Sequence, residues 1–237
     1  MSRAALEIRA NALAKTLVEP IAGEAANVAT HAIGLVLGLL ALAFLVRFTS
    51  SALGTEKAEI FWSSVVYGVT LVCVYAASTF YHAERNRRRK CVLEVADHAA
   101  IYLLIAGTFT PFGVQLGTGF GRALLVAEWC LAVVGILFKA LFGCRRYIAI
   151  SVATYLLMGW GPILLIVSIF HATSAAAVEW LIIGGLCYTA GVPIFVLSHK
   201  KPHVHALWHI SVMLGSASHF IAVFYCIQPR ITALTHV

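Results

Sequence analysis

Three histidines of this sequence have the spacing of a metal site. His205 and His209 are four residues apart and would project from one helix face, and Ser78 precedes His82 by one helical turn. Three neutral imidazoles with one open position are the ligand set of a catalytic zinc, which activates a water for hydrolysis. A nearby carboxylate commonly orients such a water, and Asp97 is the candidate. The pattern therefore favours hydrolytic zinc chemistry.

The same pattern also has simpler explanations. A histidine or serine in an apolar helix is often hydrogen-bonded to a neighbouring helix, and a chain with ten histidines contains an i,i+4 pair by chance. Asp97 could pair with the basic run 85–90 in a solvated ion pair of little consequence. His199 and His203 are also four residues apart, but Pro202 interrupts the helix between them, so we expect them in a loop.

The elements that must position these residues are predicted to be membrane-spanning helices. The chain has 237 residues, of which 61% are hydrophobic and 11% are charged, whereas soluble domains are only ~45–50% apolar. Its long unbroken apolar runs exclude a soluble domain and also a β-barrel, whose segments are short and alternating. We predict an all-α polytopic membrane protein with a single domain over residues 1–237, because the spans leave no segment for a second core.

Seven apolar segments are long enough to cross a membrane. They lie at about 27–49, 59–82, 97–116, 123–143, 148–170, 177–198 and 204–227. His82 then ends the second span, Asp97 begins the third, and His205 and His209 lie in the first turns of the seventh. Several ionisable groups at one membrane depth are costly unless they build a site. The spans therefore strengthen the metal-site interpretation.

The basic residues are divided unequally between the two sides of the predicted spans, with 13 on one side and 4 on the other. Cytoplasmic loops carry the excess of Lys and Arg, so we predict a cytoplasmic N-terminus, an external C-terminus and a cytoplasmic metal site. Residues 1–26 are expected to be a cytoplasmic segment that lies partly at the membrane interface. The net charge of +7 is scattered over short loops, which indicates the lipid bilayer rather than nucleic acid as the partner.

Other polar residues give weaker signals. Glu24, Asn27 and His31 share one face at the start of the first span, where capping and interfacial hydrogen bonds are expected. His219 lies ~15 Å along the seventh span from the paired histidines, so it cannot share their metal but could line a cavity. Glu128, near the outer end of the fourth span, is expected in an interface or a satisfied packing contact.

Cysteine and proline positions add two structural expectations. Pro162 and Pro193 fall within spans and should kink them. The six cysteines have no close-paired spacing and lie mostly in apolar runs, so we expect them to be unpaired and structural. They are Cys73, Cys91, Cys130, Cys144, Cys187 and Cys226.

Four segments that carry these residues resemble the progestin and adiponectin receptor (PAQR) family and, within it, the short bacterial type named hemolysin III. The segments occur in family order and extend across nearly the whole chain. They are Glu24-Ala-Ala-Asn27-Val-Ala-Thr30-His31, Ser78-Thr-Phe-Tyr-His82, Asp97-His-Ala-Ala-Ile-Tyr102 continuing through Gly107-Thr108 to Pro111, and His205-Ala-Leu-Trp208-His209 continuing to His219.

The resemblance implies a seven-transmembrane, hemolysin III-like domain in the cell membrane with a zinc ion held by His82, His205 and His209. It further implies that Asp97 holds a water beside the zinc, with Ser78 next to it, and that the protein hydrolyses an amide or ester of a membrane lipid, as alkaline ceramidases do. Two other functions remain open. One is a non-catalytic sensor of lipid or membrane state with a structural zinc, and the other is a hemolysin-type membrane-permeabilising protein.

Overall fold

The computed structural model describes residues 21–50, 55–117, 119–143, 147–198, 201 and 204–235. Within these residues seven helices are long and apolar enough to cross a membrane, as the sequence predicts. The elements are α2 (Ile21–Ser50), α3 (Thr55–Ala83), α4 (Arg87–Gln115), α5 (Phe120–Phe142), α6 (Ile148–Trp160), η1 (Gly161–Leu165), α7 (Ile166–Ala172), α8 (Ala175–Ser198) and α9 (His205–Thr235). The predictions for residues 1–20, His199, His203 and Cys144 lie outside the described residues.

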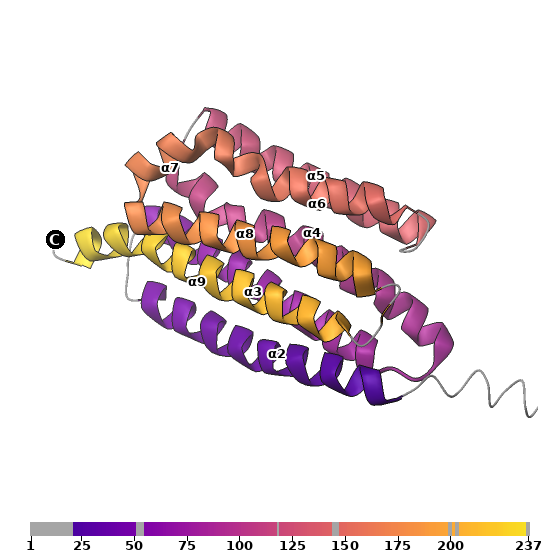
Figure 1. Cartoon of the computed structure of the whole chain (residues 1–237). Helices are drawn as coiled ribbons and strands as arrows, with labels where there is room; N and C mark the ends of the chain where they lie inside the picture. The colour runs from indigo at the N-terminus through magenta and orange to yellow at the C-terminus, as the bar shows by residue number, and fades with distance from the viewer. Residues whose placement is uncertain are drawn as a thin grey trace, which may run out of the picture.

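The helices form one elongated bundle (Figure 1). Helix α9 packs against α8, α2, α4 and α3, and α4 also contacts α5 and α6, so α4 and α9 lie between the other helices. Helix α2 begins at one end of the bundle and α9 finishes at the opposite end, as an odd number of spans requires (Figure 1). The prediction that the first of these ends faces the cytoplasm rests on the charge distribution alone.

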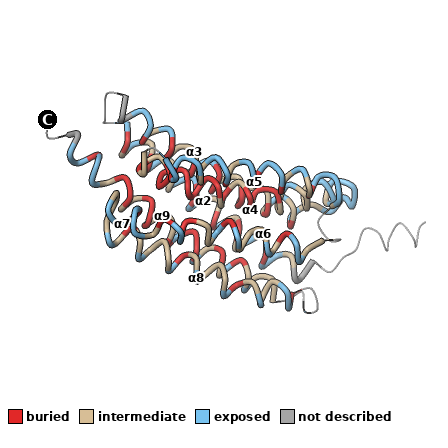
Figure 2. Tube along the Cα trace, turned by 90° about the horizontal axis from the view of Figure 1, so that it is seen from above, coloured by how far each residue is buried: buried red, intermediate tan, exposed pale blue. Residues whose placement is uncertain are grey.

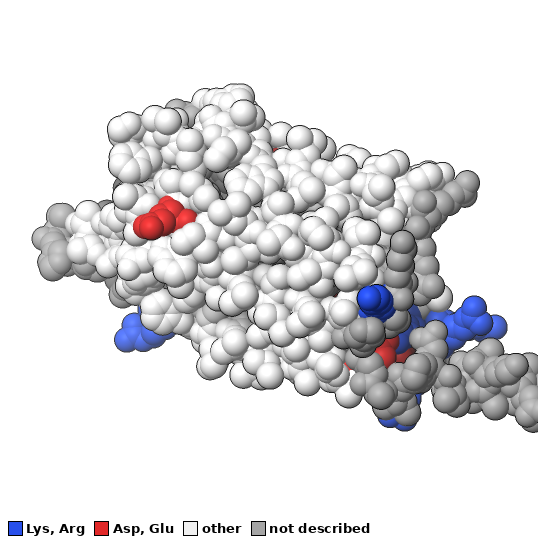
Figure 3. Space-filling view, in the orientation of Figure 1, with Lys and Arg blue, Asp and Glu red and all other residues white. Residues whose placement is uncertain are grey.

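The outer surface of the bundle is apolar. Buried residues lie on the inward faces of the helices, while exposed ones lie outside (Figure 2). Large apolar side chains such as Leu141, Leu164 and Val167 are among the most exposed. On the face seen in Figure 3, charged side chains gather at the two ends, and the band between them is almost free of charge. This surface suits a hydrocarbon solvent, because contact with lipid tails costs apolar side chains nothing.

Helix α4 begins earlier than the sequence predicts. It starts at Arg87 rather than near 97, because Asn86 caps it by accepting hydrogen bonds from the main-chain N–H groups of Arg88 and Arg89 at 3.0 and 3.3 Å. Asp97 therefore lies inside a helix and not at its beginning. The predicted start was wrong because it was taken from the first apolar residues of the segment. The first turns of α4 are polar, so they are helical but carry no apolar signal.

The two prolines within predicted spans behave differently. Pro162 lies in η1, a 3₁₀ segment that separates α6 from α7, so the expected interruption of the fifth span is present. Pro193 lies inside α8, which continues through it as one helix. The five cysteines among the described residues are all free, as predicted.

Candidate metal centre

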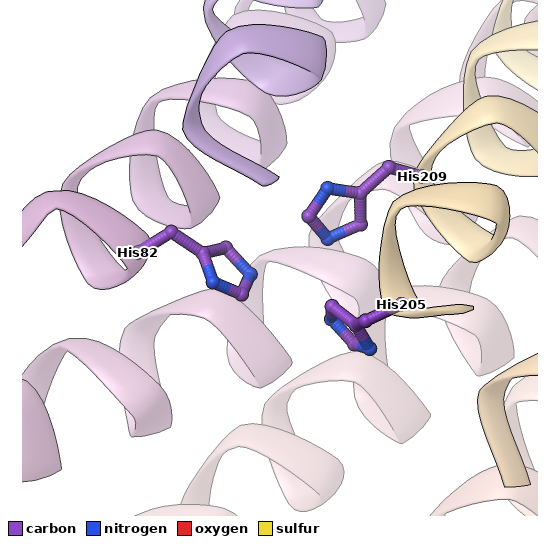
Figure 4. A group of neighbouring side chains, drawn as sticks. All are labelled: His82, His205 and His209. Carbon is purple, nitrogen blue, oxygen red and sulfur yellow. The ribbon is translucent and has the colours of Figure 1, made fainter. Parts of the chain in front are cut away.

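The three predicted histidines meet at one end of the bundle. His82 comes from the last turn of α3, and His205 and His209 come from the first two turns of α9. One ring nitrogen of each lies within 4.8 Å of the others, and the rings face one another (Figure 4). Their centroids are 5.3 Å apart for His82–His205, 4.9 Å for His82–His209 and 4.7 Å for His205–His209. This cluster could hold a metal ion.

The surroundings of the cluster fit a cation. His82 and His209 are only 6% and 1% exposed, and Nε2 of His82 is buried without a hydrogen-bond partner among the described residues. A buried nitrogen without a partner costs free energy, and coordination to an ion would remove that cost. Imidazole nitrogen is a preferred ligand of zinc and related transition metals. The donor set is therefore chemically suited to such an ion.

A second layer of polar groups surrounds the three rings. The Glu24 carboxylate on α2 lies 2.5 Å from Nδ1 of His82. In the same way, the hydroxyl of Thr30 on α2 lies 3.0 Å from Nδ1 of His209. Outer partners of this kind orient the rings of ligating histidines. The positions of these partners were not predicted, because they depend on how α2 packs against α3 and α9.

The hydroxyl of Ser198, at the end of α8, completes the layer. Its oxygen lies 3.0 Å from Nδ1 of His205. The sequence offers no helical signal for this pair, because Ser198 and His205 stand on different helices joined by the connection after α8. Each ring of the cluster therefore contacts one polar partner through Nδ1.

Glu24 links helices, which differs from the capping role expected of it. Besides His82, its carboxylate accepts a hydrogen bond from Asn27 Nδ2 at 3.1 Å and pairs with Lys90 Nζ at 2.7 Å. Lys90 belongs to the first turns of α4, so one carboxylate joins α2, α3 and α4. The spacing of Glu24 and Asn27 identified the correct face of α2, but it could not identify the partners across the bundle.

His31 forms a wall of the site rather than a ligand. Its ring stacks on His209 with centroids 3.6 Å apart and meets Tyr75 edge-on at 5.2 Å. The expected interfacial hydrogen bond is absent, since both ring nitrogens are buried without a partner among the described residues. The reason is that His31 points into the bundle and lies against another aromatic ring.

Asp97 and Ser78 lie beside the histidines, from α4 and α3. Ser78 is buried one turn before His82, and the Asp97 carboxylate lies close enough to Ser78 and His82 for electrostatic interaction with both. Among the described residues, the group of ligand atoms contains the three histidines and no carboxylate. Asp97 is therefore placed as a neighbour of the cluster.

The basic run 85–90 makes ion pairs with glutamates. Lys90 pairs with Glu24 as described above, and Arg89 Nη1 lies 4.0 Å from Glu84 Oε2. The main-chain N–H groups of Asn86 and Arg85 donate hydrogen bonds to Glu84, which lowers the pKa of its carboxyl. The alternative in which Asp97 pairs with this run is not what the structure shows, because Asp97 faces Ser78.

An apolar cavity lies next to the cluster, between α4, α6, α8 and α9. Its empty volume is about 1080 Å³, including the space at its open mouth. His219 lines it, as expected, with Nε2 3.1 Å from the Leu181 carbonyl oxygen. Phe195 and Trp208 also line it, and the Phe195 ring lies 6.3 Å from the His205 ring. The Phe195 ring therefore contacts both the cavity and the histidine cluster.

Glu128 stands apart from the cluster. It is 2% exposed in α5, and its Oε2 has no hydrogen-bond partner among the described residues. Glu128 is packed inside the bundle as expected, but within the described part of the chain its buried Oε2 lacks the hydrogen bond that a satisfied contact would give it. Helix α5 contacts α4 and α6 and carries none of the three histidines.

Comparison with known proteins gives one family and several relatives. The family described as "Haemolysin-III related" matches residues 21–220. A hemolysin-3 homolog of Bacillus subtilis is 41% identical over 208 residues, which cover 86% of this chain and 95% of that protein. Hemolysin-3 of Bacillus cereus is 39% identical over 207 residues, covering 87% and 92%. The human monocyte to macrophage differentiation factor is 26% identical over 209 residues, covering 84% and 82%.

Proposed function

The chain belongs to the haemolysin-III-related family, and from this premise we propose that it is a zinc-dependent membrane hydrolase that cleaves an amide or ester of a membrane lipid. One observation carries the proposal. The histidine cluster lies at one end of the bundle, with Asp97 and Ser78 close to it and an apolar cavity nearby. A lipid hydrolase needs all three parts within reach of one another.

His82, His205 and His209 hold the zinc ion in this proposal. When bound, zinc polarises the substrate carbonyl and makes a nearby water acidic enough to react near neutral pH. Structural zinc sites use four protein ligands, whereas catalytic sites keep a position open. Among the described residues the cluster has three ligating side chains. The ligand count therefore supports catalysis over a purely structural ion.

Asp97 and Ser78 carry the proton and charge transfers of the proposed reaction. Asp97 accepts the proton of the attacking water and later returns it to the leaving group, as a general base and then a general acid. Ser78 donates its hydroxyl proton toward the carbonyl oxygen as negative charge develops there. The two side chains lie close enough to each other to act on one substrate group.

The cavity accounts for the choice of a lipid substrate. Its lining is predominantly apolar, and Phe195 and Trp208 extend that lining to the edge of the histidine cluster. An acyl chain placed in the cavity has its polar end directed to the cluster. Burial of such a chain contributes about 0.8 kcal/mol for each CH₂ removed from water, so the cavity favours long chains.

Release of fatty acid by the purified protein tests the proposal. Zinc-loaded protein in lipid nanodiscs would be incubated with a panel of lipid amides and esters, and the products identified by mass spectrometry. We expect release from at least one lipid class and loss of release in His209→Ala. Zinc-loaded protein that releases no fatty acid from any member of the panel would instead favour a sensor with a structural zinc.

Membrane permeabilisation is a second candidate, because the Bacillus cereus relative is named Hemolysin-3. Leakage of a dye from liposomes that contain the protein measures this activity directly. If leakage depends on the metal centre, His209→Ala abolishes it together with hydrolysis. Leakage that persists in His209→Ala would make permeabilisation a function of the bundle itself.

A further inference from the structure

We infer that Glu24, Thr30 and Ser198 are positioning residues that fix the tautomers of the three histidines. Each keeps the imidazole proton on Nδ1, so that Nε2 is the nitrogen that each ring presents to a metal ion. This inference rests on the metal site of the proposed function and concerns the residues around it. A neutral histidine has one donor nitrogen and one acceptor nitrogen, and the partner of one nitrogen decides which role the other takes.

Thr30 acts as a hydrogen-bond acceptor toward His209. Its hydroxyl donates its single proton along α2, to the carbonyl oxygens of Ala26 at 2.8 Å and Asn27 at 3.0 Å. The lone pairs of Oγ1 remain for Nδ1 of His209 at 3.0 Å, so this nitrogen is the donor. This contact therefore requires an N–H at Nδ1 of His209.

Ser198 places His205 in the same tautomer. Its hydroxyl donates to the carbonyl oxygen of Phe195 at 2.7 Å, within α8. With the only hydroxyl proton used in this way, Oγ accepts from Nδ1 of His205 at 3.0 Å. The arrangement repeats that of Thr30, although the two hydroxyls come from different helices.

Glu24 can only accept a hydrogen bond from His82, whatever its other contacts are. An ionised carboxylate has no proton to give, and the ion pair with Lys90 at 2.7 Å favours the ionised form. Nδ1 of His82, 2.5 Å away, is therefore the donor. The remaining nitrogen, Nε2, is the buried atom that has no partner among the described residues. For this ring the outer contact assigns the proton to Nδ1, and the unused Nε2 is the nitrogen that remains for an ion.

The three contacts matter for metal affinity because a lone pair is what binds the ion. A proton on Nε2 would have to be displaced before that nitrogen could coordinate. Outer partners typically contribute about 10–100-fold to metal affinity or activity. We therefore expect Thr30, Ser198 and Glu24 to contribute to affinity without touching the ion.

The test removes the two hydroxyls without changing side-chain size much. Thr30→Val and Ser198→Ala, alone and together, would be purified in detergent and their zinc Kd measured by competition with a chelator. We expect each single variant to raise Kd roughly tenfold and the double variant up to about 100-fold. Thr30→Ser keeps the hydroxyl and should restore an affinity within about twofold of the parent, because the acceptor is retained.

Matched controls are available in the same bundle. Thr49 on α2 and Ser218 on α9 carry buried hydroxyls that donate to carbonyl oxygens of their own helices, those of Leu45 at 2.7 Å and Leu214 at 2.9 Å. Thr49→Val and Ser218→Ala remove the same atoms away from the histidines. These controls should leave the zinc Kd unchanged, which separates tautomer control from a general loss of packing.

A second measurement does not depend on any variant. Ring ¹⁵N chemical shifts of labelled histidines in the metal-free parent report the tautomer directly, and we expect Nδ1–H for His82, His205 and His209. Nε2–H at these rings, or an unchanged Kd in the folded double variant, would overturn the inference and leave the metal site intact. A parent protein that binds no zinc would overturn the proposed function instead.

Discussion

At the scale of single residues, the candidate site separates metal binding from proton transfer. In the proposed function the histidines supply the nitrogen ligands, while Asp97 and Ser78 lie beside them without joining the ligand group. Two kinds of substitution should therefore have different signatures. Loss of a ligand removes the ion, whereas loss of the carboxylate leaves the ion and removes the chemistry.

The first prediction concerns the ligands. The parent protein should contain about one equivalent of zinc per chain, because three imidazoles form one site. His82→Ala, His205→Ala and His209→Ala should each lose most of that zinc, as measured by metal analysis after purification. His171→Ala, in α7 and outside the cluster, is the control and should keep it. Full metal content in all three cluster variants would show that the metal binds elsewhere.

The second prediction concerns Asp97. Asp97→Asn should keep its zinc, because the three imidazoles remain, yet an amide cannot accept a proton as a carboxylate does. Turnover measured as fatty-acid release should fall by at least ~10²-fold, the typical contribution of a general base. Thermal stability should change by only about 1 kcal/mol, the net value of one hydrogen bond. Retained zinc with retained turnover would remove Asp97 from the mechanism.

At the scale of elements, two helix ends bring the site together. Helix α2 supplies no ligand, but its first turns contact two of the three histidines through Glu24 and Thr30. The start of α4 is tied to the same place, because Lys90 pairs with Glu24. The geometry of the site therefore depends on where these helices begin, and for α4 the Asn86 cap determines that point.

The third prediction addresses the cap of α4. Asn86→Ala removes the side chain that accepts from two main-chain N–H groups and should cost about 1 kcal/mol of stability. Thermal unfolding in detergent measures the loss. Asn86→Asp keeps an acceptor and should be close to the parent. Equal unfolding of the Ala and Asp variants would mean that the cap contributes nothing to the stability of the bundle.

At the scale of the whole molecule, the charge distribution and the cavity relate the bundle to its membrane. Charged residues at the two ends and a band almost free of charge between them set the depth at which the bundle lies (Figure 3). The histidine cluster lies at the end that carries the basic run 85–90, so the proposed reaction takes place near one leaflet. The cavity lies beside the cluster, and the Phe195 ring in its wall is 6.3 Å from the His205 ring.

The fourth prediction assigns this end to the cytoplasm. With 13 basic residues on one side and 4 on the other, a reporter fused after Val237 should be active only outside the cytoplasm. A second reporter, inserted after Arg85 in the connection between α3 and α4, should be active only in the cytoplasm. Cytoplasmic activity of the first fusion would reverse the orientation of the bundle and place the metal centre at the other leaflet.

The sequence alone was sufficient to predict the seven spans and the cluster of three histidines. Length and apolarity are local properties, so the seven spans could be read from windows of the chain, although the polar start of α4 at Arg87 was missed. The i,i+4 spacing of His205 and His209 is also local. His82 could be added because residues at the same end of antiparallel spans share one membrane depth.

The tertiary structure determined the contacts that depend on which helix packs against which. Glu24 meets His82 across 58 residues of sequence and Thr30 meets His209 across 179, and no local pattern contains those contacts. The stacking of His31 on His209 and the cavity between α4, α6, α8 and α9 have the same origin. Periodicity fixes the face of a helix from which a side chain projects, but only the packing of the bundle fixes the partner that it meets there.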